Sequence, residues 1–202
     1  MIGATVVCAV AVLVLLVAEA RGLVRLRILT KTSASVAFVT VGVLAQDGSA
    51  YSHWILGGLA LGAVGDLCLL GAGKRWFMAG LVAFLGCHVA YIVGIGHVAP
   101  IADWIGALAV PALVAGSLAL AWLRPHLGRM AVPVTIYVAV ITTMVIGALA
   151  TRRTPLALGA VLFFASDLAV ARQRFVGRSL GNKLWGLPTY YAGQLLIAWS
   201  IT

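Results

Sequence analysis

Long apolar runs alternate with short polar or Gly/Pro-rich breaks along the whole chain. About 20 consecutive apolar residues are enough to cross the hydrocarbon core of a membrane as an α-helix. The pattern therefore predicts an all-α polytopic membrane protein, a bundle of about eight transmembrane helices in a single domain over residues 1–202. The predicted spans are residues 2–20, 30–46, 53–70, 76–96, 104–123, 130–150, 155–171 and 184–201.

Composition excludes a soluble or disordered protein. Of the 202 residues, 63% are apolar and only 9% are charged, whereas a soluble globular domain carries about 25% charged residues. The net charge of +9 would suggest nucleic acid as the partner of a soluble chain. In a membrane protein it is first a signal of orientation, so we expect a lipid bilayer and no nucleic acid as partner.

The basic residues are distributed unevenly over the predicted loops. The first, third, fifth and seventh loops carry twelve of the fourteen Lys and Arg residues, and the other side carries only Arg152 and Arg153. Because basic loops stay in the cytoplasm, both chain termini are expected on the extracytoplasmic side of a bacterial cell (inner) membrane. Arg21 follows the first apolar run, and no basic residue precedes that run, so we interpret the run as a retained helix and not as a signal peptide.

Two aspartates are the main candidates for chemistry. Asp66 and Asp167 each lie within a predicted span, about 6 Å from its cytoplasmic end at 1.5 Å per residue. Because ionisable groups in hydrocarbon cost at least about 2.5–3.5 kcal/mol each, they usually face the interior of the bundle and serve function. A structural alternative is that each aspartate pairs with a loop arginine or with Lys31.

Further polar groups lie at or on the cytoplasmic side of the predicted midplane, and the outer half is nearly all apolar. This distribution predicts one polar cavity that opens to the cytoplasm above an apolar floor. Structural alternatives remain for some members: Ser166 bonds its own helix, His88 is a core histidine, or Glu19 pairs with Lys31. The candidate supporting residues are Glu19, Lys31, His88, Tyr91, Tyr137, Ser166, Tyr190 and Gln194.

No nucleophile elbow, zinc-protease motif or phosphate-binding loop occurs in the chain. The four histidines are scattered, so we expect neither a metal nor a cofactor. Carboxylates together with His, Tyr and Gln favour acid–base chemistry on a lipid-like molecule. Two alternatives stay open, namely a transporter or lipid-binding membrane protein that uses the aspartates as proton or cation sites, and a purely structural membrane subunit.

Several sequence blocks resemble, in order, those of the YhhN-like family of integral membrane lysoplasmalogenases. The blocks are Gly65-Asp66-Leu67-Cys68-Leu69-Leu70; Phe77 to Phe84 with His88 and Tyr91; Pro133 with Tyr137; Gly159 to Asp167; and Tyr190 to Ala198. One departure is Thr32, which follows Lys31 where the family usually has proline.

The resemblance implies hydrolysis of the vinyl-ether bond of lysoplasmalogens. The products would be a fatty aldehyde and glycerophosphoethanolamine or glycerophosphocholine. Asp66 and Asp167 would then be the catalytic pair, in the manner of the carboxylate pair of glycosidases, with one carboxyl protonated and the other ionised. The sequence leaves open which of them is the acid, and it leaves the oligomeric state open.

Overall fold

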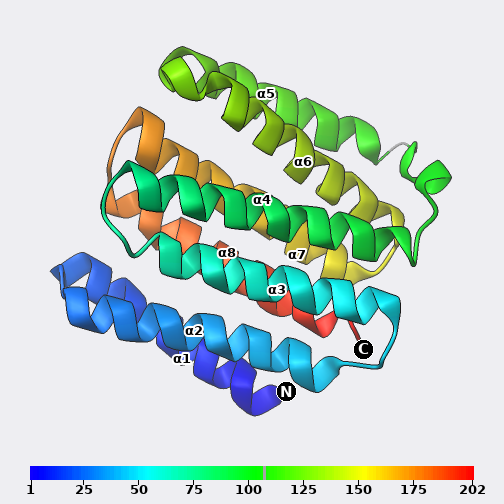
Figure 1. The fold of residues 1–202 in the computed structure, drawn as a ribbon, viewed down its shortest axis with the longest axis horizontal. Coiled ribbons are helices and arrows are strands. Elements are labelled where there is room, and N and C mark those ends of the chain that lie inside the picture. The colour runs from blue at the N-terminus through cyan, green and yellow to red at the C-terminus, as the bar shows by residue number, and fades with distance from the viewer. Residues whose placement is uncertain (107) are drawn as a thin grey trace.

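The computed structural model describes residues 1–106 and 108–202, and long helices that run back and forth along one direction make up most of the chain (Figure 1). The described residues contain no β-strand, which confirms the all-α prediction. The α-helices are α1 (Ile2–Arg21), α2 (Val24–Ala45), α3 (Ala50–Cys68), α4 (Lys74–Gly96), α5 (Ala109–Leu127), α6 (Ala131–Ala150), α7 (Thr154–Ala171) and α8 (Leu180–Trp199). Shorter turns are η1 (Ile101–Trp104), η2 (Gly128–Met130) and the π-helical η3 (Arg172–Val176).

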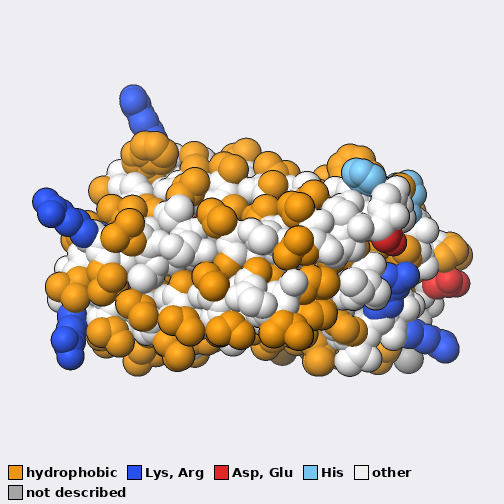
Figure 2. All heavy atoms as spheres, turned by 90° about the horizontal axis from the view of Figure 1, so that it is seen from below, with side chains coloured by type: hydrophobic (Ala, Val, Ile, Leu, Met, Phe, Trp, Pro, Cys, Tyr) orange, Lys and Arg blue, Asp and Glu red, His pale blue; other side chains and the backbone are white. Residues whose placement is uncertain are grey.

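Five stretches of the described chain are long and apolar enough to cross a membrane. They are Ile2–Arg21, Val24–Ala45, Lys74–Gly96, Ala109–Ala150 and Thr154–Val176. The fourth stretch contains both α5 and α6, whereas α3 and α8 fall outside the set. Figure 2 shows apolar side chains over the middle of the molecule and charged side chains gathered at its two ends. These features support a membrane protein, and the number of spans stays a prediction.

The second helix begins earlier than the sequence pattern predicts. α2 starts at Val24, not at residue 30. The turn before it is short because Gly22 closes α1 with a φ of 66°, a left-handed conformation that glycine adopts without steric cost. Arg25 and Arg27 therefore lie on the first turns of α2, since arginine favours helix as strongly as most apolar residues do.

Two other helices also begin several residues away from the starts of the predicted spans. α5 begins at Ala109, not at residue 104, because Trp104 belongs to the separate turn η1, where its indole N–H donates to the carbonyl of Ala99 at 3.0 Å. α8 begins at Leu180, not at residue 184, after Ser179, whose hydroxyl accepts a hydrogen bond from the N–H of Gly181 at 3.1 Å. Such N-caps stabilise the first turn of a helix.

Sequence neighbours pack in pairs, α1 on α2, α3 on α4 and α7 on α8, and α8 also contacts α1, α2 and α3. At the crossing of α7 and α8 two glycines face each other. A Cβ atom on Gly159 would lie 2.8 Å from the carbonyl oxygen of Gly193, and one on Gly193 would lie 2.9 Å from that of Gly159. Small residues allow this close backbone approach, which is a common way for helices to associate in membranes.

The two ends of the bundle differ in charge. The loops α1–α2, α3–α4, α5–α6 and α7–α8 all lie at one end, on the left of Figure 1, and both termini lie at the other. We call the first the basic end, because most Lys and Arg residues belong to its loops and the adjacent helix ends. We call the second the termini end, where Arg152, Arg153, Asp47 and Asp103 lie in the connections.

Candidate active site

A cavity of about 620 Å³ opens inside the basic end of the bundle. This volume is in the range of small-molecule sites. Every α-helix contributes to its wall, and apolar side chains from α4, α5 and α6 line much of it. The polar residues of the wall that the sequence singled out are Glu19, Lys31, Asp66, Tyr137, Ser166, Asp167 and Tyr190.

Asp66 lies near the carboxyl end of α3 with its side chain only 3% exposed. Its Oδ1 pairs with Nζ of Lys31 at 3.0 Å, and its Oδ2 accepts a hydrogen bond from the hydroxyl of Ser35 at 2.7 Å. A buried carboxylate needs such partners, because they replace the water lost on burial. The pairing of Asp66 with Lys31, which the sequence left as one alternative, is therefore present.

Asp167 lies on α7 and is held by a different set of groups. Its Oδ2 accepts a hydrogen bond from the hydroxyl of Tyr137 at 2.8 Å and lies 3.3 Å from Nε2 of His88. The same Nε2 lies 2.9 Å from the Tyr137 oxygen. α4, α6 and α7 thus bring one His, one Tyr and one Asp into mutual contact, and His88 reaches Asp167 although it does not line the cavity itself.

A chain of hydrogen bonds lies behind the cavity wall. The hydroxyl of Tyr91 donates to Oε1 of Gln194 at 2.7 Å, and Nε2 of Gln194 donates to the hydroxyl of Tyr190 at 3.2 Å. Tyr190 in turn donates to the carbonyl of Gly62 at 3.3 Å. Tyr91 and Gln194 are fully buried and do not line the cavity, so within the site they position Tyr190.

A sequence model of the YhhN family matches residues 26–201 of the chain. The chain belongs to the YhhN family. The match includes Asp66 and Asp167 together with their partners Lys31, His88 and Tyr137. The resemblance noted from the sequence blocks is therefore confirmed.

Relatives of this YhhN chain carry the name lysoplasmalogenase. One from Mycobacterium bovis is 35% identical over 159 residues, which are 72% of this chain and 59% of the relative. Lysoplasmalogenase TMEM86A of Bos taurus is 34% identical over 155 residues, 71% of this chain and 62% of the relative. Lysoplasmalogenase TMEM86B of Homo sapiens is 33% identical over 161 residues, 78% of this chain and 67% of the relative.

The YhhN chain thus spans about 60% of the length of the mycobacterial relatives that it matches. No solved structure matches it at a significant level.

Two supporting candidates, Glu19 and Ser166, have hydrogen-bond partners other than the two aspartates. Glu19 does not pair with Lys31, since its Oε2 lies 2.6 Å from Nζ of Lys183 on α8. Ser166 donates to the carbonyl of Phe163 at 2.8 Å, as the back-bonding alternative predicted. In the YhhN chain both residues line the cavity wall beside the aspartates, but neither hydrogen-bonds to them within the described residues.

Arginine side chains also contribute to this wall. Arg27, Arg174 and Arg178 line the cavity, and none of them forms an ion pair with a carboxylate in the described part of the chain. The guanidinium of Arg174 lies 4.4 Å from the ring centre of Phe77. Arginines without a carboxylate partner are suited to bind a phosphate group, because their fork of N–H donors matches its oxygens.

Two residues beside Asp66, Ser35 and Tyr191, were missed from the sequence. Ser35 bonds to Asp66, and the hydroxyl of Tyr191 lies 3.5 Å from that of Ser35 and 3.4 Å from the carbonyl of Lys31. The available signal was spacing, because Lys31 and Ser35 are four residues apart and so share one face of α2.

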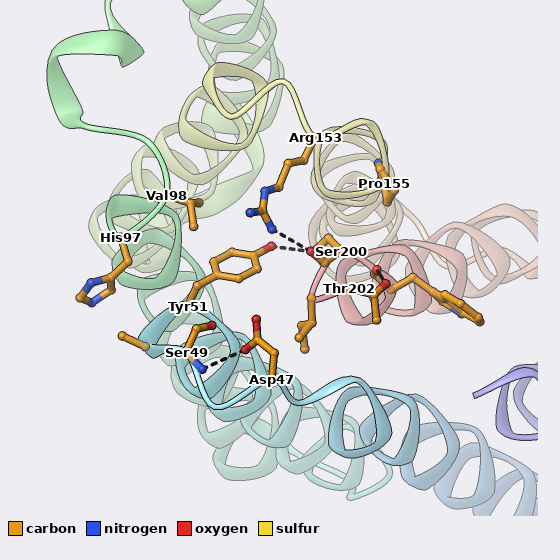
Figure 3. A pocket seen from close by; sticks show the side chains of 12 residues that line it. Asp47, Ser49, Tyr51, His97, Val98, Arg153, Pro155, Ser200 and Thr202 are labelled. Carbon is orange, nitrogen blue, oxygen red and sulfur yellow. Dashed lines mark hydrogen bonds between the residues drawn. The ribbon is translucent and has the colours of Figure 1, made fainter.

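A second cavity, of about 600 Å³, lies at the termini end (Figure 3). There Nη1 of Arg153 donates to the carbonyl of Ser200 at 3.1 Å, and the hydroxyls of Tyr51 and Ser200 are 2.6 Å apart. Hydrogen bonds from Ser49, from its side chain above all, lower the pKa of the exposed Asp47 to about 2. None of the candidate residues predicted from the sequence lines this cavity.

Proposed function

We propose that this YhhN protein hydrolyses the vinyl-ether bond of lysoplasmalogens, releasing a fatty aldehyde and glycerophosphoethanolamine or glycerophosphocholine. One observation carries the proposal: Asp66 and Asp167 line the same cavity, each with a distinct set of polar partners. The name lysoplasmalogenase of the relatives supports the choice of substrate.

The chemistry requires a proton donor and a negative charge. A proton added to the outer alkenyl carbon converts the vinyl ether into an oxocarbenium ion, which water then attacks. The resulting hemiacetal breaks into the aldehyde and the glycerol hydroxyl. A carboxyl group can donate the proton, and carboxylate charge can stabilise the cation and accept a proton from water, as in glycoside hydrolysis.

The roles follow from the surroundings of each group. Asp66 and Asp167 are the catalytic residues, and the reaction needs no metal or cofactor. Arg27, Arg174 and Arg178 receive the phosphate of the lysophospholipid, and the apolar wall receives the alkenyl chain. The supporting residues are Glu19, Lys31, His88, Tyr91, Tyr137, Ser166, Tyr190 and Gln194.

The cavity also fits a membrane setting. We propose that α1 to α8 all cross a bacterial inner membrane, with the basic end in the cytoplasm and the termini outside. A single-chain lipid would then place its phosphate among the interfacial arginines and its ether bond a few ångströms deeper. The uneven distribution of basic loops supports this orientation.

The test is to measure aldehyde release from a lysoplasmalogen by the detergent-purified protein. Asp66→Asn and Asp167→Asn are expected to lower the rate by about 10²–10⁴-fold, the usual contribution of an acid–base group. Asp47→Asn, at the termini end, is the matched control and is expected to keep the rate. A folded Asn variant at residue 66 or 167 with the wild-type rate would remove that aspartate from catalysis, and an inactive wild type would overturn the proposal.

A further inference from the structure

The two aspartates differ in how their oxygens are occupied. Both oxygens of Asp66 are engaged, Oδ1 by Lys31 and Oδ2 by Ser35. Both contacts of Asp167 are made by Oδ2, and within the described residues no hydrogen bond reaches its Oδ1. The side chain of Asp167 is also more open, with 18% of its surface exposed against 3% for Asp66. Of the two aspartates, Asp167 therefore has an oxygen without a hydrogen-bond partner in the described residues, next to the cavity.

The charges next to the two groups differ as well. The ammonium of Lys31 lies 3.0 Å from Oδ1 of Asp66, so this carboxyl group has a cationic neighbour. No lysine or arginine in the described chain forms an ion pair with Asp167, whose polar neighbours are Tyr137 and His88. Whether Asp167 has a cationic neighbour thus depends on His88.

The contacts of His88 indicate a neutral ring. The side chain is fully buried, and its Nδ1 has no hydrogen-bond partner among the residues described. Protonating both nitrogens would bury an N–H without an acceptor, which is unfavourable. A single proton on Nε2 instead faces the oxygens of Tyr137 and Asp167, so Nε2–H donates toward Tyr137 and Tyr137 donates to Asp167. This assignment leaves Asp167 without a neighbouring cation.

We infer that Asp167 performs the proton transfers and that Asp66, paired with Lys31, remains a fixed negative charge. This inference rests on the proposed function. In a protonated Asp167 the carbonyl oxygen is Oδ2, which accepts from Tyr137, and the hydroxyl oxygen is Oδ1, which is free to donate. The contacts of Oδ2 and the unpartnered Oδ1 fit a neutral carboxyl group in this position.

In this assignment Asp167 makes every proton transfer of the reaction and ends with its proton restored. The Oδ1 proton of Asp167 moves to the outer alkenyl carbon, where the electron pair of the double bond forms the new C–H bond. Asp167 becomes a carboxylate whose Oδ2 already accepts the Tyr137 hydrogen bond, and the cation lies in the field of Asp66. Water adds to the cationic carbon and gives a proton back to Oδ1. The same carboxyl then protonates the glycerol oxygen while it takes the proton of the hemiacetal hydroxyl, which releases the aldehyde.

The pH dependence of aldehyde release distinguishes the two roles. The groups that face Asp167 are His88 and Tyr137, and those that face Asp66 are Lys31 and Ser35. In the wild type the rate is expected to fall on the alkaline side, because the proposed reaction starts from a protonated carboxyl group. Asp167→Asn is expected to abolish this alkaline fall. Asp66→Asn is expected to lower the rate at all pH values but to keep the alkaline fall.

Chemical rescue provides a second measurement. Asp167→Ala opens space at the cavity wall, so added formic acid is expected to restore turnover in proportion to its undissociated form. Asp66→Ala under the same conditions is the matched control and is expected to show no rescue. Unchanged size-exclusion profiles establish that both variants are folded.

Three results would overturn the assignment. The first is that Asp66→Asn loses the alkaline fall and Asp167→Asn keeps it. The second is that both variants keep the alkaline fall. The third is that formic acid rescues Asp66→Ala but not Asp167→Ala. Each leaves the hydrolase proposal intact, because the wild type still releases aldehyde. An inactive wild type would instead remove the proposed function and the assignment together.

Discussion

The ion pair of Lys31 and Asp66 is the residue-scale feature with the largest energetic consequence. Each side chain is nearly enclosed, with 11% and 3% of its surface exposed. Removing one member of such a pair leaves the other charge buried and unpaired, which costs more than removing both. The pair therefore offers a way to separate a structural from a catalytic role.

We predict that Lys31→Gln lowers the free energy of unfolding by about 3 kcal/mol and also lowers the rate of aldehyde release. The double variant Lys31→Gln/Asp66→Asn is expected to recover most of this stability but not the rate, because the catalytic charge is absent. Thermal unfolding in detergent and the aldehyde assay measure the two effects. A double variant no more stable than the single one would contradict this view of the pair.

At the scale of residues, the sequence identified most polar groups of the site but not which of them contact one another. The sequence predicted Asp66 and Asp167 at similar depths in the bundle. This was possible because the position of a residue along a helix of known direction gives its distance along the helix axis. The direction in which each helix face points, and which helices are neighbours in the bundle, do not follow from this distance. The partners His88 and Tyr137 were accordingly recognised as polar residues without being assigned to Asp167, and Ser35 was missed.

At the scale of elements, α7, which carries Asp167, crosses α8 closely at Gly159 and Gly193. The carbonyl oxygens of Gly159 and Gly193 leave no room for a Cβ atom on the facing residue. The two helices are expected to separate if either glycine is enlarged.

Gly159→Ala is predicted to lower the free energy of unfolding by about 1–3 kcal/mol, the usual cost of overpacking. Gly57→Ala on α3 is the matched control, since a Cβ atom there meets no atom within 4 Å and alanine favours helix more than glycine does. Thermal unfolding of both variants in the same detergent measures the difference. Equal stability of Gly159→Ala and the wild type would refute the crossing as described.

Helix positions were largely predictable from apolar runs, whereas the starts of α2, α5 and α8 were not. The start of α2 was missed because Arg25 and Arg27 were counted as loop residues although arginine continues a helix readily. The start of α8 was missed because Asn182 and Lys183 look like loop residues, whereas both line the cavity on the first turn of that helix.

At the scale of the whole molecule, the separation of charge between the two ends predicts orientation. His97 and His126 are both exposed, the first at the carboxyl end of α4 and the second in the last turn of α5, at opposite ends of the bundle. They form a matched pair for labelling, because both side chains are exposed histidines close to a helix end.

In a variant without native cysteines, His97→Cys is expected to react with a membrane-impermeant maleimide on intact cells. His126→Cys is expected to react only after the membrane is permeabilised, because the basic end faces the cytoplasm. Labelling of His126→Cys alone on intact cells would invert the proposed orientation, and the cysteine-free parent measures background.

The cavities at the two ends share no lining residue in the described part of the chain. The hydrogen-bonded row of Tyr91, Gln194 and Tyr190 is buried in the bundle, and none of its members lines the cavity at the termini end. We therefore expect that water entering either cavity does not reach the other. On that expectation, a cell could carry many copies of such a protein without dissipating its proton gradient.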